Sequence, residues 1–198
     1  MKTAKILWSL GSILVNITIG IYIYLQINGP KTLEGQFQYI NDNWAAYSGH
    51  WKAEFLIMTL ITIGAIYFAL NLKNISWTII SVGQIIILLT YPFMMGGYHE
   101  TPYELAKMAN QMALLTFVFG NLIFLAGLFH LYLHTDVLKA WLRYVALTIS
   151  GIATIAFLLI FIGVITWKDA MLMGPLINAL YLINAYYGFQ MKDQNMNL

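Results

Sequence analysis

Four side chains of this 198-residue sequence have the types and spacing to take part in chemistry. His50 and Glu54 are four residues apart in "GHWKAEF", which places both on one face if the segment is helical. His99 and Glu100 are neighbours in "GGYHE", a turn that follows a strongly apolar run. Imidazole and carboxylate ligands together suit zinc, manganese, iron or copper. These residues form a candidate metal site, and the alternative is a solvated or salt-bridged rim.

The residues that follow this turn have a structural explanation. Thr101 is suited to cap a helix, Pro102 to its first position, and Glu104 to the third position after the cap. Lys107 follows Glu104 by about one helical turn and can pair with it. This capping box leaves His99 and Glu100 as the residues of the segment without a structural role.

The elements that position these residues are predicted to be membrane helices. Hydrophobic residues make up 60% of the chain and charged residues 9%, whereas a soluble domain has about 25% charged residues. A helix needs about 20 apolar residues to cross a bilayer. Uncharged stretches near or above that length lie at 6–30, 55–72, 74–98, 108–135, 144–167 and 170–191. The sequence predicts an all-α polytopic protein with six transmembrane helices in a single domain, 1–198.

The orientation follows from the basic residues. Six crossings place both ends on one side, and the lysines and arginine on that side outnumber those on the other. They are Lys2, Lys5, Lys73, Lys139, Arg143 and Lys192. Because an excess of Lys and Arg marks the cytoplasmic side, we expect an inner-membrane protein with both termini in the cytoplasm. His50, Glu54, His99 and Glu100 then lie at the outer face.

The longest connection between predicted spans, residues 28–53, carries a helical pattern. Leu33, Phe37, Ile40, Trp44 and Tyr47 recur at spacings of four and three residues, with polar residues between them. The pattern predicts a short amphipathic helix that lies along the outer interface or caps the bundle. An ordered loop anchored by its aromatic residues is the alternative.

Other polar residues give weaker indications. His130 and His134 lie at the inner end of the fourth predicted helix, and on one helix face they cannot ligate opposite sides of one haem. Headgroup contacts and a metal are their alternative roles. Asn16, Gln84, Asn121 and Asn178 would indicate a ligand site if they converged. The ten basic residues are scattered, so nucleic-acid binding is not expected.

Proline and glycine predict local features of the helices. Pro92 and Pro175 each remove a backbone donor, so we expect kinks in the outer parts of two spans. Gly120 and Gly127 allow a neighbouring helix to approach closely. No cysteine is present, which excludes disulfides and thiolate ligands.

Methionines away from the chain ends all fall in the predicted outer half of the bundle. They are Met58, Met94, Met95, Met108, Met112, Met171 and Met173. Thioethers prefer soft ions such as Cu(I), so copper handling is one interpretation. Methionine also fills irregular gaps and lines adaptable apolar surfaces. The second interpretation predicts an outward-facing cleft with polar and Met-rich walls.

The segment "NQMALLTFVFGNLIFLAGLFHLYLHTDVLKAWLRYVALTISGIAT", residues 110–154, resembles the fourth and fifth helices of an uncharacterised family of bacterial six-helix membrane proteins. In that family a Phe/Gly/Leu/His helix leads through a short basic turn into a Gly-containing helix. The resemblance covers about a quarter of the chain. It implies the six-helix fold and carries no activity to transfer.

The functional prediction is a binding or transport-associated protein for a small apolar or amphiphilic ligand. The predicted ligand-binding residues are His50, Trp51, Glu54, His99, Glu100 and Trp167. One alternative is a membrane metalloenzyme or copper-handling protein in which His50, Glu54, His99 and Glu100 hold zinc, iron or copper. Another is an accessory subunit without chemistry of its own. The expected partners are the lipid bilayer and either a second copy of the chain or a membrane complex.

Overall fold

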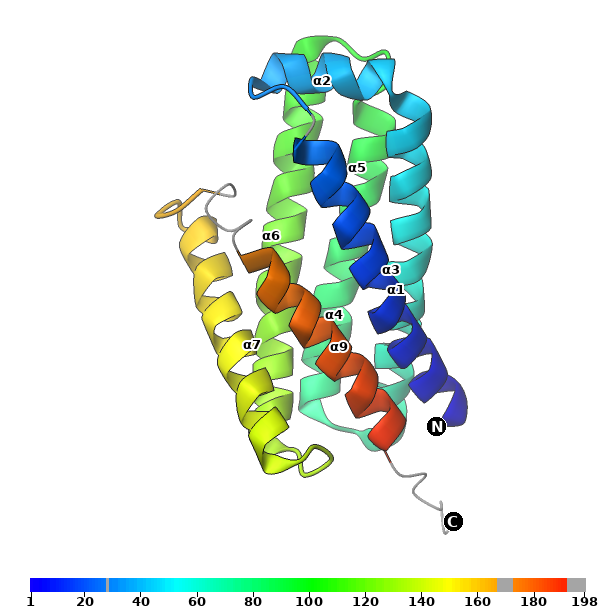
Figure 1. The fold of residues 1–198 in the computed structure, drawn as a ribbon, viewed down its shortest axis with the longest axis vertical. Coiled ribbons are helices and arrows are strands. Elements are labelled where there is room, and N and C mark those ends of the chain that lie inside the picture. The colour runs from blue at the N-terminus through cyan, green and yellow to red at the C-terminus, as the bar shows by residue number, and fades with distance from the viewer. Residues whose placement is uncertain (28, 167–172, 192–198) are drawn as a thin grey trace.

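The structure, a computed structural model, describes residues 1–27, 29–166 and 173–191. Over these residues the chain forms helices that pack lengthwise into a bundle and no strands (Figure 1). The helices are α1 (Lys2–Ile27), α2 (Leu33–Asp42), α3 (Trp44–Leu72), α4 (Ile75–Leu88), α5 (Thr90–Gly97), α6 (Tyr103–His134), α7 (Ala140–Phe161) and α9 (Gly174–Gln190). The predicted all-α fold is thus confirmed.

Five segments of the described chain are long and apolar enough to cross a membrane. They are Lys2–Leu25, Trp44–Leu72, Ile75–Gly97, Tyr103–His134 and Ala140–Phe161. This is the pattern expected of a membrane-embedded protein. The predicted sixth crossing corresponds to α9, which has 17 residues and is shorter than these five segments.

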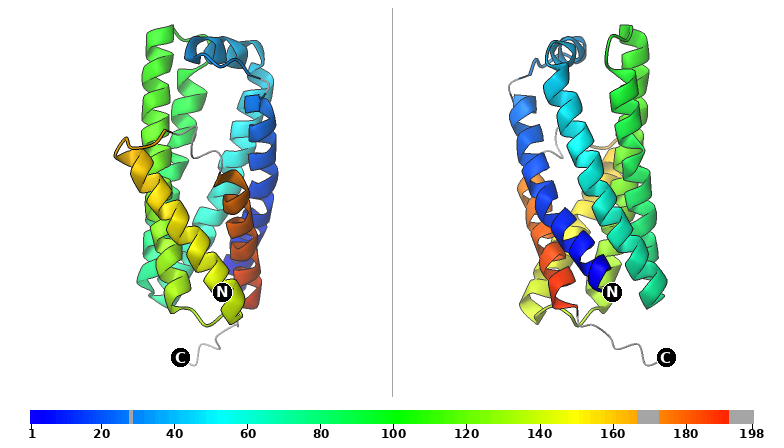
Figure 2. Two further views of the ribbon diagram at one scale, coloured as in Figure 1. Left: turned by 60° about the vertical axis from the view of Figure 1, so that its left-hand side comes forward. Right: turned by 90° about the vertical axis from the view of Figure 1, so that its right-hand side faces the viewer.

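The first and last described helices lie side by side. α9 packs against α1, and the end of α9 lies at the same end of the bundle as the start of α1 (Figures 1 and 2). The short helix α2 lies across the opposite end (Figure 1). α7 and α9 flank the part of the bundle farther from α2 (Figure 2). The end with α2 is called the outer end below, and the opposite end the inner end.

The α4–α6 interface depends on glycine. A Cβ atom added to Gly83 would lie 2.7 Å from Phe124 Cα and 2.8 Å from the Gly120 carbonyl oxygen. A Cβ atom on Gly120 would lie 2.8 Å from the Ile87 backbone nitrogen. Real Cβ atoms essentially never come so close to other atoms, and here the obstacles are backbone atoms. The two backbones therefore touch because each helix has a glycine where they cross, as the sequence predicted for Gly120.

Proline acts at helix boundaries. α4 ends at Leu88 and α5 begins at Thr90, because Pro92 has no N–H to donate to the Leu88 carbonyl. The helix is thus interrupted near Pro92, where the sequence predicted a kink. Pro175 does not kink a helix, because it occupies the first turn of α9, where its missing N–H has no cost. The prediction of a kink at Pro175 was wrong.

A buried aromatic cluster joins α1, α3, α4, α6 and α9 near the inner end. The Trp8 ring meets the Trp77 and Phe68 rings at centroid distances of 4.9 and 6.5 Å. Trp8 Nε1 also donates a hydrogen bond of 2.8 Å to the Asn184 carbonyl oxygen. The Tyr132 hydroxyl donates to Asn184 Oδ1. This cluster fixes α9 against α1, α4 and α6.

A short helix, α2, is present in the connection where the sequence predicted one, but its boundaries differ from the prediction. α2 ends at Asp42, and α3 already begins at Trp44. The connection predicted to reach residue 53 is therefore short, and Trp44 and Tyr47 belong to α3. The capping box was also wrong. Pro102 takes the cap position of α6, while the Thr101 hydroxyl donates to the His99 carbonyl oxygen.

Asn41 fastens α2 to the turn between α5 and α6. Its Nδ2 donates to the Tyr98 carbonyl oxygen at 3.0 Å, and its Oδ1 accepts from the Glu100 backbone N–H at 2.8 Å. Glu100 has a φ of 50°, a left-handed conformation that non-glycine residues seldom adopt. Burial raises the pKa of the Tyr98 phenol, so its hydroxyl stays protonated and donates to Asn110 Oδ1 at 2.8 Å. Asn41 thus holds a strained turn in place.

Asn41→Ala should loosen this end of the bundle. Without its side chain, the Glu100 N–H and the Tyr98 carbonyl lose a hydrogen bond each, at a local cost of roughly 1–3 kcal/mol. We expect faster amide hydrogen exchange in α2 and in residues 98–100. Asn43→Ala is the matched control, since Asn43 Nδ2 bonds only the nearby Tyr39 carbonyl among the described residues. Equal exchange rates in both variants would contradict the role given to Asn41.

Candidate functional site

His50 and Glu54 lie together near the outer end, as their spacing predicted. His50 Nε2 lies 3.6 Å from Glu54 Oε2, and the exposed fractions of the two side chains are 3% and 17%. The Tyr22 ring of α1 stacks on the His50 ring at a centroid distance of 6.1 Å. The Thr18 hydroxyl, one turn before Tyr22, lies 3.5 Å from Glu54 Oε1. Helices α1 and α3 thus enclose an imidazole and a carboxyl group.

Two further tyrosines approach Glu54 from other helices. Tyr91 of α5 lies beside the Glu54 carboxyl group. Tyr181 of α9 lies close enough to interact electrostatically with the same group. Both tyrosines are buried. Glu54 is therefore surrounded by hydroxyl groups from α1, α5 and α9.

The His50 ring is buried without a hydrogen bond. Over the described residues, neither Nδ1 nor Nε2 has a hydrogen-bond partner, and 3.6 Å to Glu54 is an ion-pair distance too long for a hydrogen bond. Buried polar groups are nearly always paired, and ionisable groups inside membrane bundles are rare and usually functional. His50 is therefore the most informative side chain of the site.

His99 and Glu100 have different neighbours. The His99 ring packs on Trp44 at a centroid distance of 4.5 Å, and its Nδ1 lies 4.0 Å from Glu100 Oε2. Both side chains are exposed. Trp51 connects this region to the core, because its ring contacts both Trp44 and Tyr98. The structure thus gives two separate pairs, one buried and one at the surface.

The predicted metal site gains no support. Among the residues that the structure describes, no three His, Asp, Glu or Cys side chains come together as a group that could hold a metal ion. A catalytic zinc ion usually has three protein ligands, and His50 with Glu54 supplies two. Trp167, the last of the predicted ligand-binding residues, lies outside the described residues.

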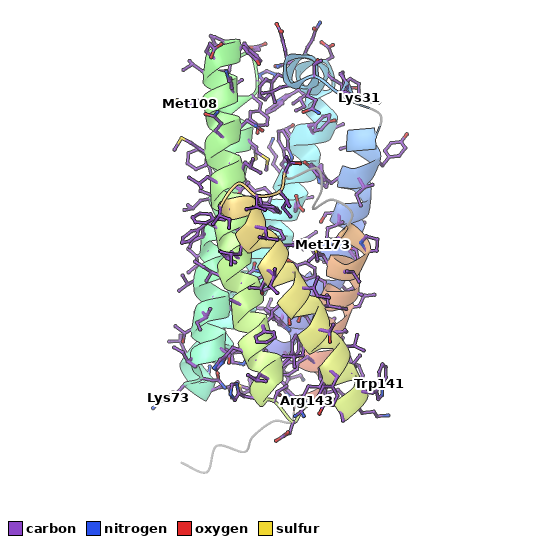
Figure 3. The ribbon with its side chains drawn as sticks, turned by 90° about the vertical axis from the view of Figure 1, so that its left-hand side faces the viewer. Lys31, Lys73, Met108, Trp141, Arg143 and Met173 are labelled. Carbon is purple, nitrogen blue, oxygen red and sulfur yellow. The ribbon has the colours of Figure 1, made fainter. Side chains whose placement is uncertain are left out.

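The methionines are dispersed and do not line one cleft. Met58 is buried in the core, and Met94 and Met95 are partly buried against it. Met108 and Met112 are exposed on α6. Figure 3 shows Met108 near the outer end and Met173 well below it. Met171 lies outside the described residues. Filling of gaps, the second interpretation of these residues, fits the buried and partly buried methionines.

Two hollows in the described surface lie away from His50 and Glu54. One has a volume of about 400 Å³ and is lined by Tyr144, Val145, Thr148, Ile149 and Leu176. The other has a volume of about 300 Å³ and is lined by Ile86, Leu115, Thr116, Phe119 and Phe161. Both walls are almost entirely apolar, and neither includes a predicted ligand-binding residue.

The inner histidines have structural partners. His130 Nδ1 and the Ser76 hydroxyl form a hydrogen bond of 2.8 Å that links α6 to α4. His134 Nδ1 donates to the His130 carbonyl oxygen, one turn earlier. Asn16 and Asn121 likewise donate to carbonyls of their own helices, so these two amides show no shared ligand site.

Thr18, Tyr22, Tyr91 and Tyr181 are the site residues that sequence reasoning missed. Thr18 and Tyr22 are four residues apart on α1, which matches the spacing of His50 and Glu54 on α3. That shared spacing is the one signal that could have found them. Nothing in the local sequence marks Tyr91 among thirteen tyrosines.

Comparison with known proteins assigns no family or function to this chain. No family model, curated protein or solved structure matches this chain. The geometry around His50 and Glu54 is therefore the basis for any functional proposal.

Proposed function

We propose that the protein is a six-helix bundle of a bacterial inner membrane, with both termini in the cytoplasm and α2 along the outer interface. With 17 residues, α9 is about 26 Å long, close to the ~30 Å of a bilayer core. Lys73 and Arg143 lie at the inner end and Lys31 at the outer end (Figure 3). The positive-inside rule then assigns the inner end to the cytoplasm.

Within this orientation, the protein binds a small amphiphilic ligand between α1, α3 and α5. One observation carries this function: the buried His50 imidazole has no hydrogen-bond partner among the described residues, although Glu54 lies beside it. A polar ligand group that bonds His50 and Glu54 would remove the cost of leaving the imidazole unpaired. The apolar part of the ligand would lie against aromatic side chains such as Tyr22 and Tyr91.

The His50–Glu54 pair and the His99–Glu100 pair have different roles in this function. His50, Glu54 and the adjacent Trp51 belong to the ligand site proper. His99 and Glu100 lie at the surface on the α5–α6 turn that Asn41 fastens. They would meet a ligand as it arrives from the outer side. Binding by a second copy of the chain or a larger membrane complex stays a prediction.

Ligand-dependent stabilisation of the purified protein tests this function. A ligand at 100 times its Kd stabilises the native state by about 2.7 kcal/mol. We expect at least one member of a panel of neutral, cationic and anionic amphiphiles to raise the unfolding temperature of the unmodified protein. His50→Leu should abolish the response because it removes the polar group that the ligand pairs with.

His134→Leu is the matched control for this experiment. His134 is exposed at the inner end of α6, so the variant should respond to the same amphiphile as the unmodified protein does. An amphiphile that stabilises the His50→Leu variant equally would show that binding occurs elsewhere. A panel without any stabilising member would remove the proposed function.

A further inference from the structure

α9 turns a polar face toward the bundle interior. Asn178, Tyr181, Asn184 and Tyr187 recur at every third position, so each lies beside the next on the helix surface, in a row that winds gradually around α9. Tyr181, Asn184 and Tyr187 are buried. By contrast, Leu182, Tyr186 and Phe189 are exposed on the other side of α9. Burial of a polar group costs free energy unless the group is hydrogen-bonded. The buried polar residues of α9 therefore need an explanation.

The outer part of this polar face reaches Glu54. Tyr181 lies next to the Glu54 carboxyl group, and its hydroxyl also faces the side-chain amide of Gln84 on α4. Tyr181 and Gln84 lack the geometry of an ordinary hydrogen bond, since Gln84 makes none with the described residues. Glu54 in turn contacts Thr18 and His50. Polar groups are thus continuous from His50 to Gln84.

The inner part of the face reaches the cytoplasmic end. Asn184 Oδ1 accepts from the Tyr132 hydroxyl, and the Tyr132 ring lies 6.1 Å from that of Tyr187. The Tyr187 hydroxyl accepts from Thr135 Oγ1 at 3.2 Å. The Thr135 carbonyl oxygen then accepts from Arg143 Nη1 at 3.1 Å, and Arg143 is partly exposed. The polar groups therefore extend to the inner surface.

Unpaired polar atoms lie on the helices that form these two parts. Gln84 is fully buried, and neither its Oε1 nor its Nε2 has a partner among the described residues. The same holds for Asn184 Nδ2, Asn178 Oδ1 and Ser12 Oγ. Tyr181 and Asn184 are one helical turn apart. Groups of this kind are ordinarily bridged by ordered water, which makes two to four hydrogen bonds at each position.

We propose that protons cross the protein along this polar face of α9, between Glu54 at the outer end and Thr135 with Arg143 at the inner end. Carboxyl, hydroxyl and water groups can each receive a proton from one neighbour while giving one to the next. In each step one O–H bond breaks at the donor and one forms at the acceptor, so nothing is oxidised or reduced. Water beside Gln84 and Asn184 would carry the proton past the amides, which do not exchange it.

This path goes beyond the ligand site, because it requires no organic ligand at His50. A ligand bound to Glu54 would close its outer entrance, so the two proposals meet at one residue. They nevertheless fail separately: stabilisation by an amphiphile measures the ligand site, and proton flux without any amphiphile measures the path.

Proton flux into liposomes tests the path. The protein is reconstituted with a pH-sensitive dye inside, and a potassium gradient with valinomycin drives protons inward. Flux should exceed that of protein-free liposomes. Tyr181→Phe, which removes one hydroxyl group, should lower the protein-dependent flux about tenfold. Gln84→Leu should lower it similarly, because a leucine displaces water from the middle of the path.

Tyr186→Phe is the matched control, since Tyr186 lies on the exposed side of the same helix. Its flux should equal that of the unmodified protein. Circular dichroism and unfolding temperature establish that each variant is folded before flux is compared. Flux no faster than in protein-free liposomes would overturn the proposal, and so would a Tyr181→Phe variant that conducts like the unmodified protein.

Discussion

Gly83→Val should cause one of the largest losses of stability available from a single substitution in this chain. The new Cβ would meet Phe124 Cα at 2.7 Å and the Gly120 carbonyl oxygen at 2.8 Å. Backbone atoms cannot rotate aside as a flexible side chain can, so α4 and α6 must separate along their whole contact. Taking about 3 kcal/mol for severe overpacking, the unfolding temperature should fall by roughly 6–12 °C.

The control for this prediction is Gly20→Val on α1. A Cβ atom on Gly20 meets nothing within 4 Å, and Gly20 is exposed. The same change in side chain should therefore leave the unfolding temperature nearly unchanged. Thermal unfolding in one detergent, followed by circular dichroism, compares the two variants directly. If Gly83→Val unfolds at the temperature of the unmodified protein, the α4–α6 contact is looser than described.

Trp8→Ala should destabilise the protein about as much as Gly83→Val does, because it leaves a cavity where Gly83→Val creates a steric clash. Trp8 has an exposed fraction of 0% and packs against both Trp77 and Phe68, whose rings also contact each other. Its loss leaves a cavity and also removes the hydrogen bond to the Asn184 carbonyl oxygen. Replacement of a buried Trp or Phe by Ala costs about 3–5 kcal/mol. The expected consequence is a lower unfolding temperature and faster hydrogen exchange in α9.

Trp141→Ala provides the comparison for Trp8→Ala, because Trp141 has an exposed fraction of 65% at the start of α7. It should change stability little in detergent. Trp8→Phe should lie between the two, since a ring remains while the N–H donor is lost. A Trp8→Ala variant as stable as Trp141→Ala would show that the aromatic cluster does not hold α9 in place.

The helices were predictable from the sequence because hydropathy alone marks apolar spans. The start of α3 was not, since Trp44–Ala53 is polar enough to resemble a connection, whereas in the structure it is helical and its Trp51 ring packs on Tyr98. Whether α9 is long and apolar enough to cross the membrane was also difficult to predict. Its inward face carries Asn and Tyr, and its 17 residues make it shorter than the five apolar segments.

The candidate site was predictable in part. A spacing of four residues was enough to pair His50 with Glu54, because helix geometry fixes that contact. It could not show that His99 would pack on Trp44, since this contact depends on how α3 meets the α5–α6 turn. Nor could it show that Tyr22, Tyr91 and Tyr181 would surround the carboxyl group. Those residues come from α1, α5 and α9 and meet Glu54 only through tertiary packing.

The hydrogen bonds between α1 and α9 also constrain how the chain is made. Trp8 and Ser9 bond the carbonyl oxygens of Asn184 and Ala185, which follow them by 176 residues. At a synthesis rate of about 5–20 residues per second, the first helix waits roughly 9–35 s for the last. During that time an indole N–H and a hydroxyl group lack their final acceptors within the lipid. The nascent chain must therefore satisfy them temporarily, through the insertion machinery or through its own earlier helices.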